Sequence, residues 1–293
     1  MMTELKNSNC IEEYQENGKT KVRIKPFNAL IELYDNQIPT GNIKENLDKL
    51  QNYVMKVADA KGLTKPASAA FSNTRGTWFE VMIAIQSWNY RIKRGYNDYL
   101  IIKMPNVKTF DFRKIFDDET REKLYQLEKS LLTHKQQVRL ITSNPDLLII
   151  RQKDLIKDEY NQPIDKFTHE NVDTALTLFK HLERKCKWDS LVAGIGLKTS
   201  LRPDRRLQLV HEGNILKSLF AHLKMRYWNP KAEFKYYGAS SEPVSQADDD
   251  ALQTAATHTI VNVNSTPERA VDDVFSLTSF EDIDKMLDQI IKK

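Results

Sequence analysis

Cysteine is almost absent from this chain. Only Cys10 and Cys186 occur among its 293 residues, which excludes a framework of several disulfides and a zinc site made of four cysteines. The six histidines show no metal-ligand spacing with them. No run of about 18 apolar residues occurs, so no membrane-spanning helix is expected. The polar N-terminus is unlike a secretory signal, and we therefore expect the protein to work in the reducing cytosol.

A strong net charge is also missing. The chain has 44 Lys and Arg against 40 Asp and Glu, a formal net charge of +4. Binding to nucleic acid would therefore depend on local clusters of basic residues and not on the charge of the whole molecule. Residues 198–206 form such a cluster, with four basic side chains against one aspartate. By itself such a run is equally typical of a solvated surface.

Hydrophobic periodicity predicts a chain of alternating strands and helices. Helices are expected over residues 43–61, 74–95, 117–135, 171–185, 203–223 and 279–291, and strands over residues 99–104, 138–141, 147–150, 191–197, 233–237 and 259–263. Residues 1–20 are expected to form a loose polar arm, residues 63–72 a connection and residues 238–250 a polar loop. The alternation from residue 138 to residue 223 implies an α/β core with a partly parallel sheet. We divide the chain into an N-terminal helical region, 1–70, and a core, 71–293.

Two strand ends carry the first candidate site. Asp146 stands directly before the apolar run of residues 147–150, and Lys198 directly follows the strand predicted over residues 191–197. A carboxylate that opens one strand and a lysine that closes another can meet at the same end of a sheet. Hydrolysis of a phosphodiester needs a divalent ion held by oxygen ligands, a positioned water and a cation near the developing charge. Asp146 can supply a ligand, and Lys198 can orient the water or neutralise the phosphate.

A second acid is missing from its usual place. Most nucleases with this pairing carry an acid two residues before the lysine, where this chain has Gly196. Glu212 is the candidate replacement, because it shares one face of the predicted helix with three leucines and so points towards the sheet. A carboxylate buried there needs a partner, which could be a metal ion or an arginine. Glu80, inside an apolar helix, could likewise support the metal or the water, or form a structural salt bridge.

The segment after the lysine can read bases. Arginine can donate two hydrogen bonds to guanine O6 and N7, and aspartate can accept one from cytosine N4. Arg202, Asp204 and Arg205 offer this pattern, with phosphate contact as the alternative. Arg206 suits a phosphate contact or an ion pair in the core. Trp228, which ends the long helix, suits a subunit interface or the core.

Taken together, these motifs resemble one family. Pro145-Asp146, the thirteen residues between Lys198 and Glu212, and Arg202-Pro203-Asp204-Arg205 are similar to the type II restriction endonucleases that cut CCGG-containing sites. That group includes the tetrameric enzymes of the NgoMIV and SgrAI kind, and the chain is most similar to the branch that recognises purine-CCGG-pyrimidine. The resemblance implies a restriction-endonuclease-like core with a mixed central sheet flanked by helices, and a smaller, mainly helical N-terminal part.

The resemblance also implies roles for the residues above. Catalysis is assigned to Asp146, Lys198, Glu212 and Glu80, with Mg²⁺ held by Asp146 and Glu212. Base reading is assigned to Arg202, Asp204 and Arg205. From the residues themselves, we expect DNA-backbone contact by Thr199, Ser200 and Arg206, and an oligomer interface at Trp228. The expected partner is double-stranded DNA, bound by a homodimer that assembles into a homotetramer in the prokaryotic cytoplasm, away from any membrane. Cleavage is expected before the first cytosine and leaves 5′-phosphates.

Two other functions fit parts of the pattern. A DNA-binding regulator could use the arginines without catalysis, and it would bind DNA in chelator but never cut it. A repair nuclease with the same α/β core would cut without regard to CCGG. The position and sequence of cut ends on a known plasmid distinguish all three.

Overall fold

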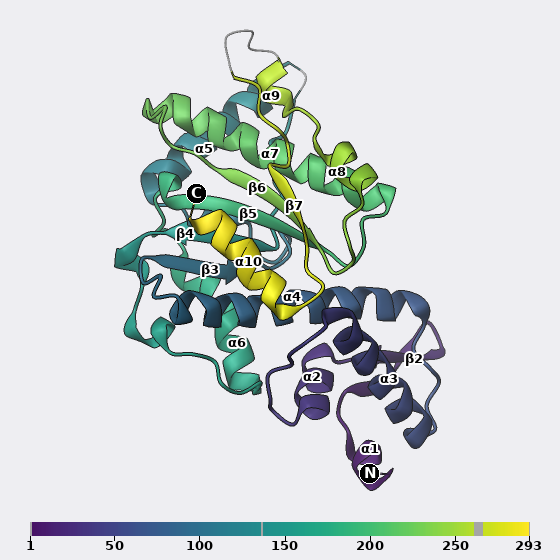
Figure 1. Ribbon diagram of the computed structural model, residues 1–293. Coiled ribbons are helices and arrows are strands. Elements are labelled where there is room, and N and C mark those ends of the chain that lie inside the picture. The colour runs from purple at the N-terminus through teal and green to yellow at the C-terminus, as the bar shows by residue number, and fades with distance from the viewer. Residues whose placement is uncertain (1, 136, 261–265, 293) are drawn as a thin grey trace.

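A five-stranded mixed sheet forms the centre of the protein in a computed structural model that describes residues 2–135, 137–260 and 266–292 (Figure 1). The strand order is β3-β4-β5-β6-β7. Neighbouring strands are antiparallel from β3 to β5 and parallel from β5 to β7. The strands are β3 (Tyr99–Lys103), β4 (Leu147–Arg151), β5 (Leu191–Lys198), β6 (Lys235–Ser240) and β7 (Asp273–Ser276). The predicted α/β architecture with a mixed sheet is confirmed.

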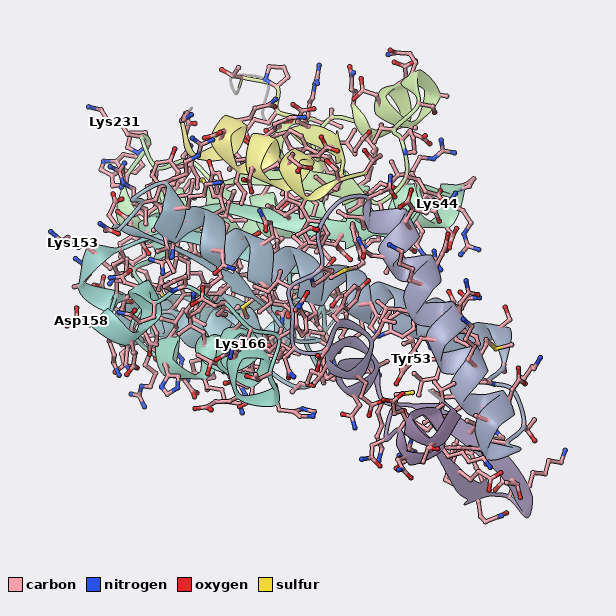
Figure 2. The ribbon with its side chains drawn as sticks, turned by 60° about the horizontal axis from the view of Figure 1, so that its bottom comes forward. Lys44, Tyr53, Lys153, Asp158, Lys166 and Lys231 are labelled. Atoms are coloured by element: carbon pink, nitrogen blue, oxygen red, sulfur yellow. The ribbon has the colours of Figure 1, made fainter. Side chains whose placement is uncertain are left out.

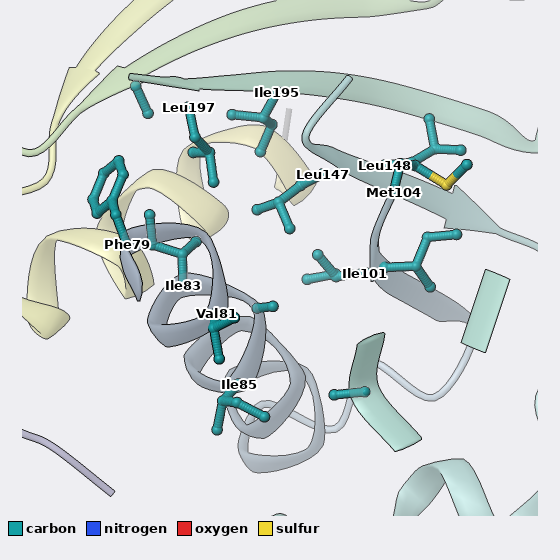
Figure 3. Close-up of a cluster of buried hydrophobic side chains, with 14 of the residues drawn as sticks. Phe79, Val81, Ile83, Ile85, Ile101, Met104, Leu147, Leu148, Ile195 and Leu197 are labelled. Carbon is teal, nitrogen blue, oxygen red and sulfur yellow. The ribbon is translucent and has the colours of Figure 1, made fainter. Parts of the chain in front are cut away.

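Helices cover both faces of this sheet. The long helix α4 (Ser68–Lys93) packs on one face together with α10 (Phe280–Ile291), and Gln86 Nε2 of α4 donates a 2.7 Å hydrogen bond to Asp284 Oδ1 of α10. In Figure 3, side chains of α4 such as Phe79 and Ile83 lie against those of β4 and β5, among them Leu147 and Leu197. The helix α7 (Pro203–Tyr227) packs on the opposite face, and α5 (Asp118–Thr133) lies beside it.

Alternation along β5 sorts its side chains between the two faces. Ile195 and Leu197 point towards α4 (Figure 3), so Gly196 faces α7. A Cβ atom on Gly196 would lie 2.5 Å from Leu209 Cδ2 of α7, closer than packed atoms approach. Close packing against α7 therefore leaves no room for a side chain at Gly196.

The N-terminal region projects from one end of the core. It contains α1 (Met2–Asn7), the hairpin strands β1 (Ile11–Glu16) and β2 (Lys19–Ile24), α2 (Pro26–Tyr34) and α3 (Ile43–Lys61). In Figure 2, α3 runs from Lys44, near the core, past Tyr53 and away from it. Its first backbone N–H, on Ile43, donates a 2.8 Å hydrogen bond to Thr278 O beside α10. The remaining elements are α6 (His169–Thr177), α8 (Gln246–Leu252), α9 (Thr257–Ile260) and the 3₁₀ turns Phe112–Ile115, Lys153–Leu155, Asp158–Asn161, Leu178–Leu182 and Trp188–Ser190.

Several local predictions agree with the structure. The helix predicted from residue 43 is capped by Asn42, whose side chain accepts from Glu45 N, and ends at Gly62 with a φ of 68°. The strands predicted over residues 147–150 and 191–197 and the final helix are also present. The fourth helix begins at Ser68, earlier than predicted, and therefore runs across the proposed boundary between residues 70 and 71. That boundary remains a prediction.

Other local predictions are wrong. Residues 138–141 form no strand, and Ile141 is 63% exposed. Thr259 and Ile260 belong to the helix α9, and the rest of the strand predicted over residues 259–263 lies outside the described residues. The expected loop at residues 238–250 contains the end of β6 and most of α8, and residues 1–20 hold α1, β1 and the start of β2.

Within the described parts of the chain, every helix is too short or too polar to cross a membrane.

A pair of helical glycines gives a test of this packing. A Cβ atom on Gly213 in α7 would lie 2.1 Å from Ala270 O, whereas one on Gly76 in α4 would meet nothing within 4 Å. Alanine is usually more stable than glycine in a helix by about 1 kcal/mol. We predict that Gly76→Ala leaves the melting temperature unchanged or raises it, and that Gly213→Ala lowers it by several degrees. Equal effects of the two substitutions in thermal denaturation would contradict the packing of α7.

Candidate active site

The antiparallel pairing of β4 with β5 brings the two predicted strand ends together. Leu147 pairs with Ile195, so Asp146, directly before β4, lies beside the end of β5. Asp146 Oδ2 accepts a 2.6 Å hydrogen bond from the backbone N–H of Leu197. The ammonium of Lys198 lies 3.7 Å from the same oxygen. The carboxylate is therefore fixed by the backbone of the neighbouring strand and faces the lysine.

The turn before β4 is held by Asn144. Its side-chain amide donates to Pro105 O at 2.7 Å and to Phe110 O at 2.6 Å, and its oxygen accepts from Phe112 N at 2.9 Å. Three hydrogen bonds from one side chain therefore anchor this part of the loop to the segment after β3. This anchoring fixes where Asp146 enters the sheet.

Glu212 reaches the site from the α7 side. Its Oε1 lies 3.8 Å from Lys198 Nζ, and its Oε2 accepts a 2.6 Å hydrogen bond from the hydroxyl of Tyr236 on β6. Burial raises the pKa of the Glu212 carboxyl, Lys198 opposes that rise, and the nearby charge of Asp146 adds to it. Lys198 thus lies between two carboxylates that come from different elements.

Glu80 approaches from the opposite face of the sheet. It lies on α4, and its Oε2 forms a 2.8 Å ion pair with Lys103 Nζ at the end of β3. Burial raises the pKa of the Glu80 carboxyl, as does the charge of Asp146, while Lys103 and Lys198 lower it. The structural salt bridge that the sequence allowed as an alternative for Glu80 is therefore present. Glu80 still lies close enough to interact with Asp146 and Lys198.

These groups have the chemistry of a divalent-cation site. Over residues 2–135, 137–260 and 266–292, the structure contains no group of three or more His, Cys, Asp and Glu side chains arranged to hold a metal ion. Asp146 and Glu212, the two carboxylates within 4 Å of the Lys198 ammonium, would hold such an ion. Two carboxylates fit Mg²⁺, which usually takes one or two from the protein and fills the remaining positions with water and phosphate oxygens.

The basic segment begins where β5 ends. Arg202 caps the start of α7, and its side chain is 64% exposed. Asp204 Oδ2 lies 3.4 Å from Arg202 Nη2 and 3.7 Å from Arg205 Nε. All three side chains lie in the first turn of one helix, with Asp204 also more than half exposed. The donor and acceptor groups that base reading requires are therefore accessible and next to one another.

The other predicted residues occupy different surroundings. Thr199 and Ser200 follow Lys198 and are half-buried, and Thr199 borders a cleft of about 460 Å³ that is otherwise lined by α3, α4 and the segment before α4. Arg206 forms a 2.8 Å ion pair with Asp248 of α8. Trp228 is 88% exposed at the end of α7, so the alternative that it belongs to the core is wrong.

Two residues beside the site were not found from the sequence. Lys103 is the last residue of β3, just as Lys198 is the last residue of β5. Its position at a strand end could therefore have indicated it from the sequence. No pattern in the sequence indicated Tyr236. It reaches Glu212 because β6 lies parallel to β5, a neighbour relation that the sequence alone does not give.

The stability of the metal-free protein should depend on Glu212. The pKa of its carboxyl in the folded protein is raised above the value of 4.5 expected in the unfolded chain. The free energy of unfolding therefore falls as the pH rises above the pKa of the unfolded chain, and this loss is complete once the pH exceeds the pKa in the folded protein. We predict that Glu212→Gln raises the melting temperature in chelator at neutral pH, and that the gain shrinks towards pH 4.5. Glu233→Gln, at a carboxylate 71% exposed, is the control. A gain that does not change with pH would contradict this account.

Comparison with known proteins identifies relatives along almost the whole chain. The family profile described as Cfr10I/Bse634I restriction endonuclease matches residues 8–293. The type II restriction enzyme Cfr10I of Citrobacter freundii is 33% identical over 263 residues, which cover 87% of this chain and 89% of that protein.

Two solved structures agree closely with the fold. The Bse634I restriction endonuclease is 88% identical over 99% of both chains, with a TM-score of 0.94. The type IIF restriction endonuclease Bse634I with cognate DNA is 88% identical with a TM-score of 0.95, over 98% of this chain and 99% of that one. These findings exclude the interpretations as a non-catalytic regulator and as a repair nuclease. The chain belongs to the Cfr10I/Bse634I family of type II restriction endonucleases, enzymes of restriction-modification systems that cleave DNA at specific sequences.

Proposed function

We propose that this enzyme cuts both strands of DNA at purine-CCGG-pyrimidine sites, before the first cytosine, in a Mg²⁺-dependent reaction that leaves 5′-phosphates. The observation that carries the proposal is the meeting of Asp146, Lys198 and Glu212, with both carboxylates within 4 Å of the Lys198 ammonium. The wider grouping with the NgoMIV and SgrAI enzymes, and action in the prokaryotic cytoplasm, belong to the same proposal.

Each residue of the cluster has a distinct role in this proposal. Asp146 and Glu212 hold Mg²⁺, which when bound polarises the phosphate and lowers the pKa of a bound water. Lys198 orients the attacking water or neutralises the charge that develops on the phosphate. Glu80 contributes negative charge from the α4 side and pairs with Lys103 at the end of β3.

The first turn of α7 reads the CCGG core in this proposal. Arg202 and Arg205 donate to guanines, and Asp204 accepts from cytosine amino groups. Thr199, Ser200 and Arg206 contact the DNA backbone.

A palindromic site calls for a two-fold dimer. We propose that two dimers join into a tetramer through the exposed Trp228. Sedimentation of the parent protein and of the Trp228→Ala variant tests this assembly.

Cleavage of a plasmid of known sequence tests the proposed function. With Mg²⁺, all ends should map to purine-CCGG-pyrimidine sites, and chelator should abolish cutting. Asp146→Ala and Lys198→Ala should lower the single-turnover rate about a hundredfold or more, because electrostatic contacts to a transition state typically count that much. Both variants should still bind the cognate duplex. Cutting by Lys198→Ala at near the parental rate would assign that lysine a structural role.

Base reading and phosphate contact make different predictions for the arginines. Replacing an arginine that reads guanine should cost about 1–3 kcal/mol on the cognate duplex and little on random DNA. Arg202→Ala and Arg205→Ala should therefore collapse the ratio of specific to nonspecific affinity, measured with Ca²⁺ at one salt concentration. Arg206→Ala is the matched control, and it should weaken binding to both duplexes alike. If Arg202→Ala and Arg205→Ala behave like the Arg206→Ala control, this helix turn contacts phosphates only.

A further inference from the structure

We propose that Tyr236 is a positioning residue for Glu212, and that it fixes the carboxylate that stands in for the acid absent at Gly196. This inference rests on the proposed function, because it assumes that Glu212 is a metal ligand. Tyr236 itself would touch neither metal nor DNA. It would act by holding one oxygen of Glu212 so that the other faces the site.

The contact is well defined. Tyr236 is 0% exposed, and a buried hydroxyl requires a hydrogen-bond partner, which is Glu212 Oε2 at 2.6 Å. The tyrosine hydroxyl is the donor in this contact, because an ionised carboxylate can only accept hydrogen bonds. With Oε2 engaged, Oε1 is the oxygen that faces Lys198, at 3.8 Å.

The backbone of Tyr236 is itself fixed. Its N–H donates to Asp272 Oδ2 at 2.7 Å, and its carbonyl accepts from the backbone N–H of Asp272 at 2.7 Å. The carboxylate of Asp272 forms a 2.7 Å ion pair with Lys217, a buried residue of α7 five positions after Glu212. One polar contact therefore joins α7 directly to β6, a second joins them through Asp272, and the close approach of Gly213 to Ala270 lies between the two along the helix. The tyrosine is held on a rigid support, as accurate placement of a ligand requires.

The missing side chain at Gly196 belongs to the same arrangement. A Cβ atom there would lie 2.4 Å from the Tyr236 hydroxyl and 3.3 Å from Glu212 Oε2. Any side chain at this position would begin in the space that the hydroxyl occupies. The tyrosine, together with Leu209, therefore excludes an acid from the usual position, and it supports the acid that replaces it. Groups that orient a metal ligand typically change metal affinity or activity by about 10–100-fold when they are removed.

The test is Tyr236→Phe, with Tyr237→Phe as its control. Tyr237 is the next residue of β6 and is also buried, but its side chain points to the opposite face of the sheet. We expect Tyr236→Phe to raise the Mg²⁺ concentration for half-maximal cleavage at least tenfold, with much of the rate recovered at saturating Mg²⁺. Calorimetric titration of Ca²⁺ into the enzyme–cognate duplex complex should show the same loss of affinity. Tyr237→Phe should behave as the parent in both measurements.

A further variant separates the possible failures. Glu212→Gln should lose Ca²⁺ affinity more than Tyr236→Phe does. If Glu212→Gln binds Ca²⁺ like the parent, the proposed metal role of Glu212 is wrong. If Glu212→Gln loses affinity and Tyr236→Phe does not, only the positioning role is overturned.

Discussion

The antiparallel pairing of β4 with β5 is the interaction on which the site depends. It places Asp146, which precedes one strand, beside Lys198, which ends the other, and the N–H of Leu197 binds the carboxylate directly. A shift of one residue in this pairing would turn every side chain of β4 to the other face. The clamp formed by Asn144 and the backbone hydrogen bond from Leu197 to Asp146 hold the pairing in register.

Residues from the two helical layers complete the charged cluster at the strand ends. Glu212 comes from α7 on one face and Glu80 from α4 on the other, so the charged cluster lies where both layers meet the strand ends. Burial raises the pKa of both acids, which means that the site costs folding stability while no cation is bound. Proteins commonly accept such a cost where function needs concentrated charge.

Local patterns in the sequence predicted the site residues whose positions are set by a single strand or helix. Asp146 and Lys198 were marked by their places at strand ends, and Glu212 by the face it shares with leucines. Tyr236 was not predictable, because its contact depends on which strand lies parallel to β5. Asn17-Gly18, with φ of 51° and 71°, is a strong hairpin signal, and it contradicts the loose arm predicted over residues 1–20. The strand predicted over residues 138–141 failed because alternation alone does not supply a neighbouring strand with which to pair.

The central claim is that Glu212, displaced from the usual position of the acid, joins Asp146 in holding the metal ion. A crystal structure of this enzyme with its cognate duplex and Ca²⁺ tests the claim most directly, since Ca²⁺ takes oxygen ligands at about 2.3–2.6 Å. We predict an ion bound by Asp146 and by Glu212 Oε1, next to the scissile phosphate, with Tyr236 still donating to Oε2. An ion bound by Asp146 while Glu212 remains paired only with Lys198 would contradict the account.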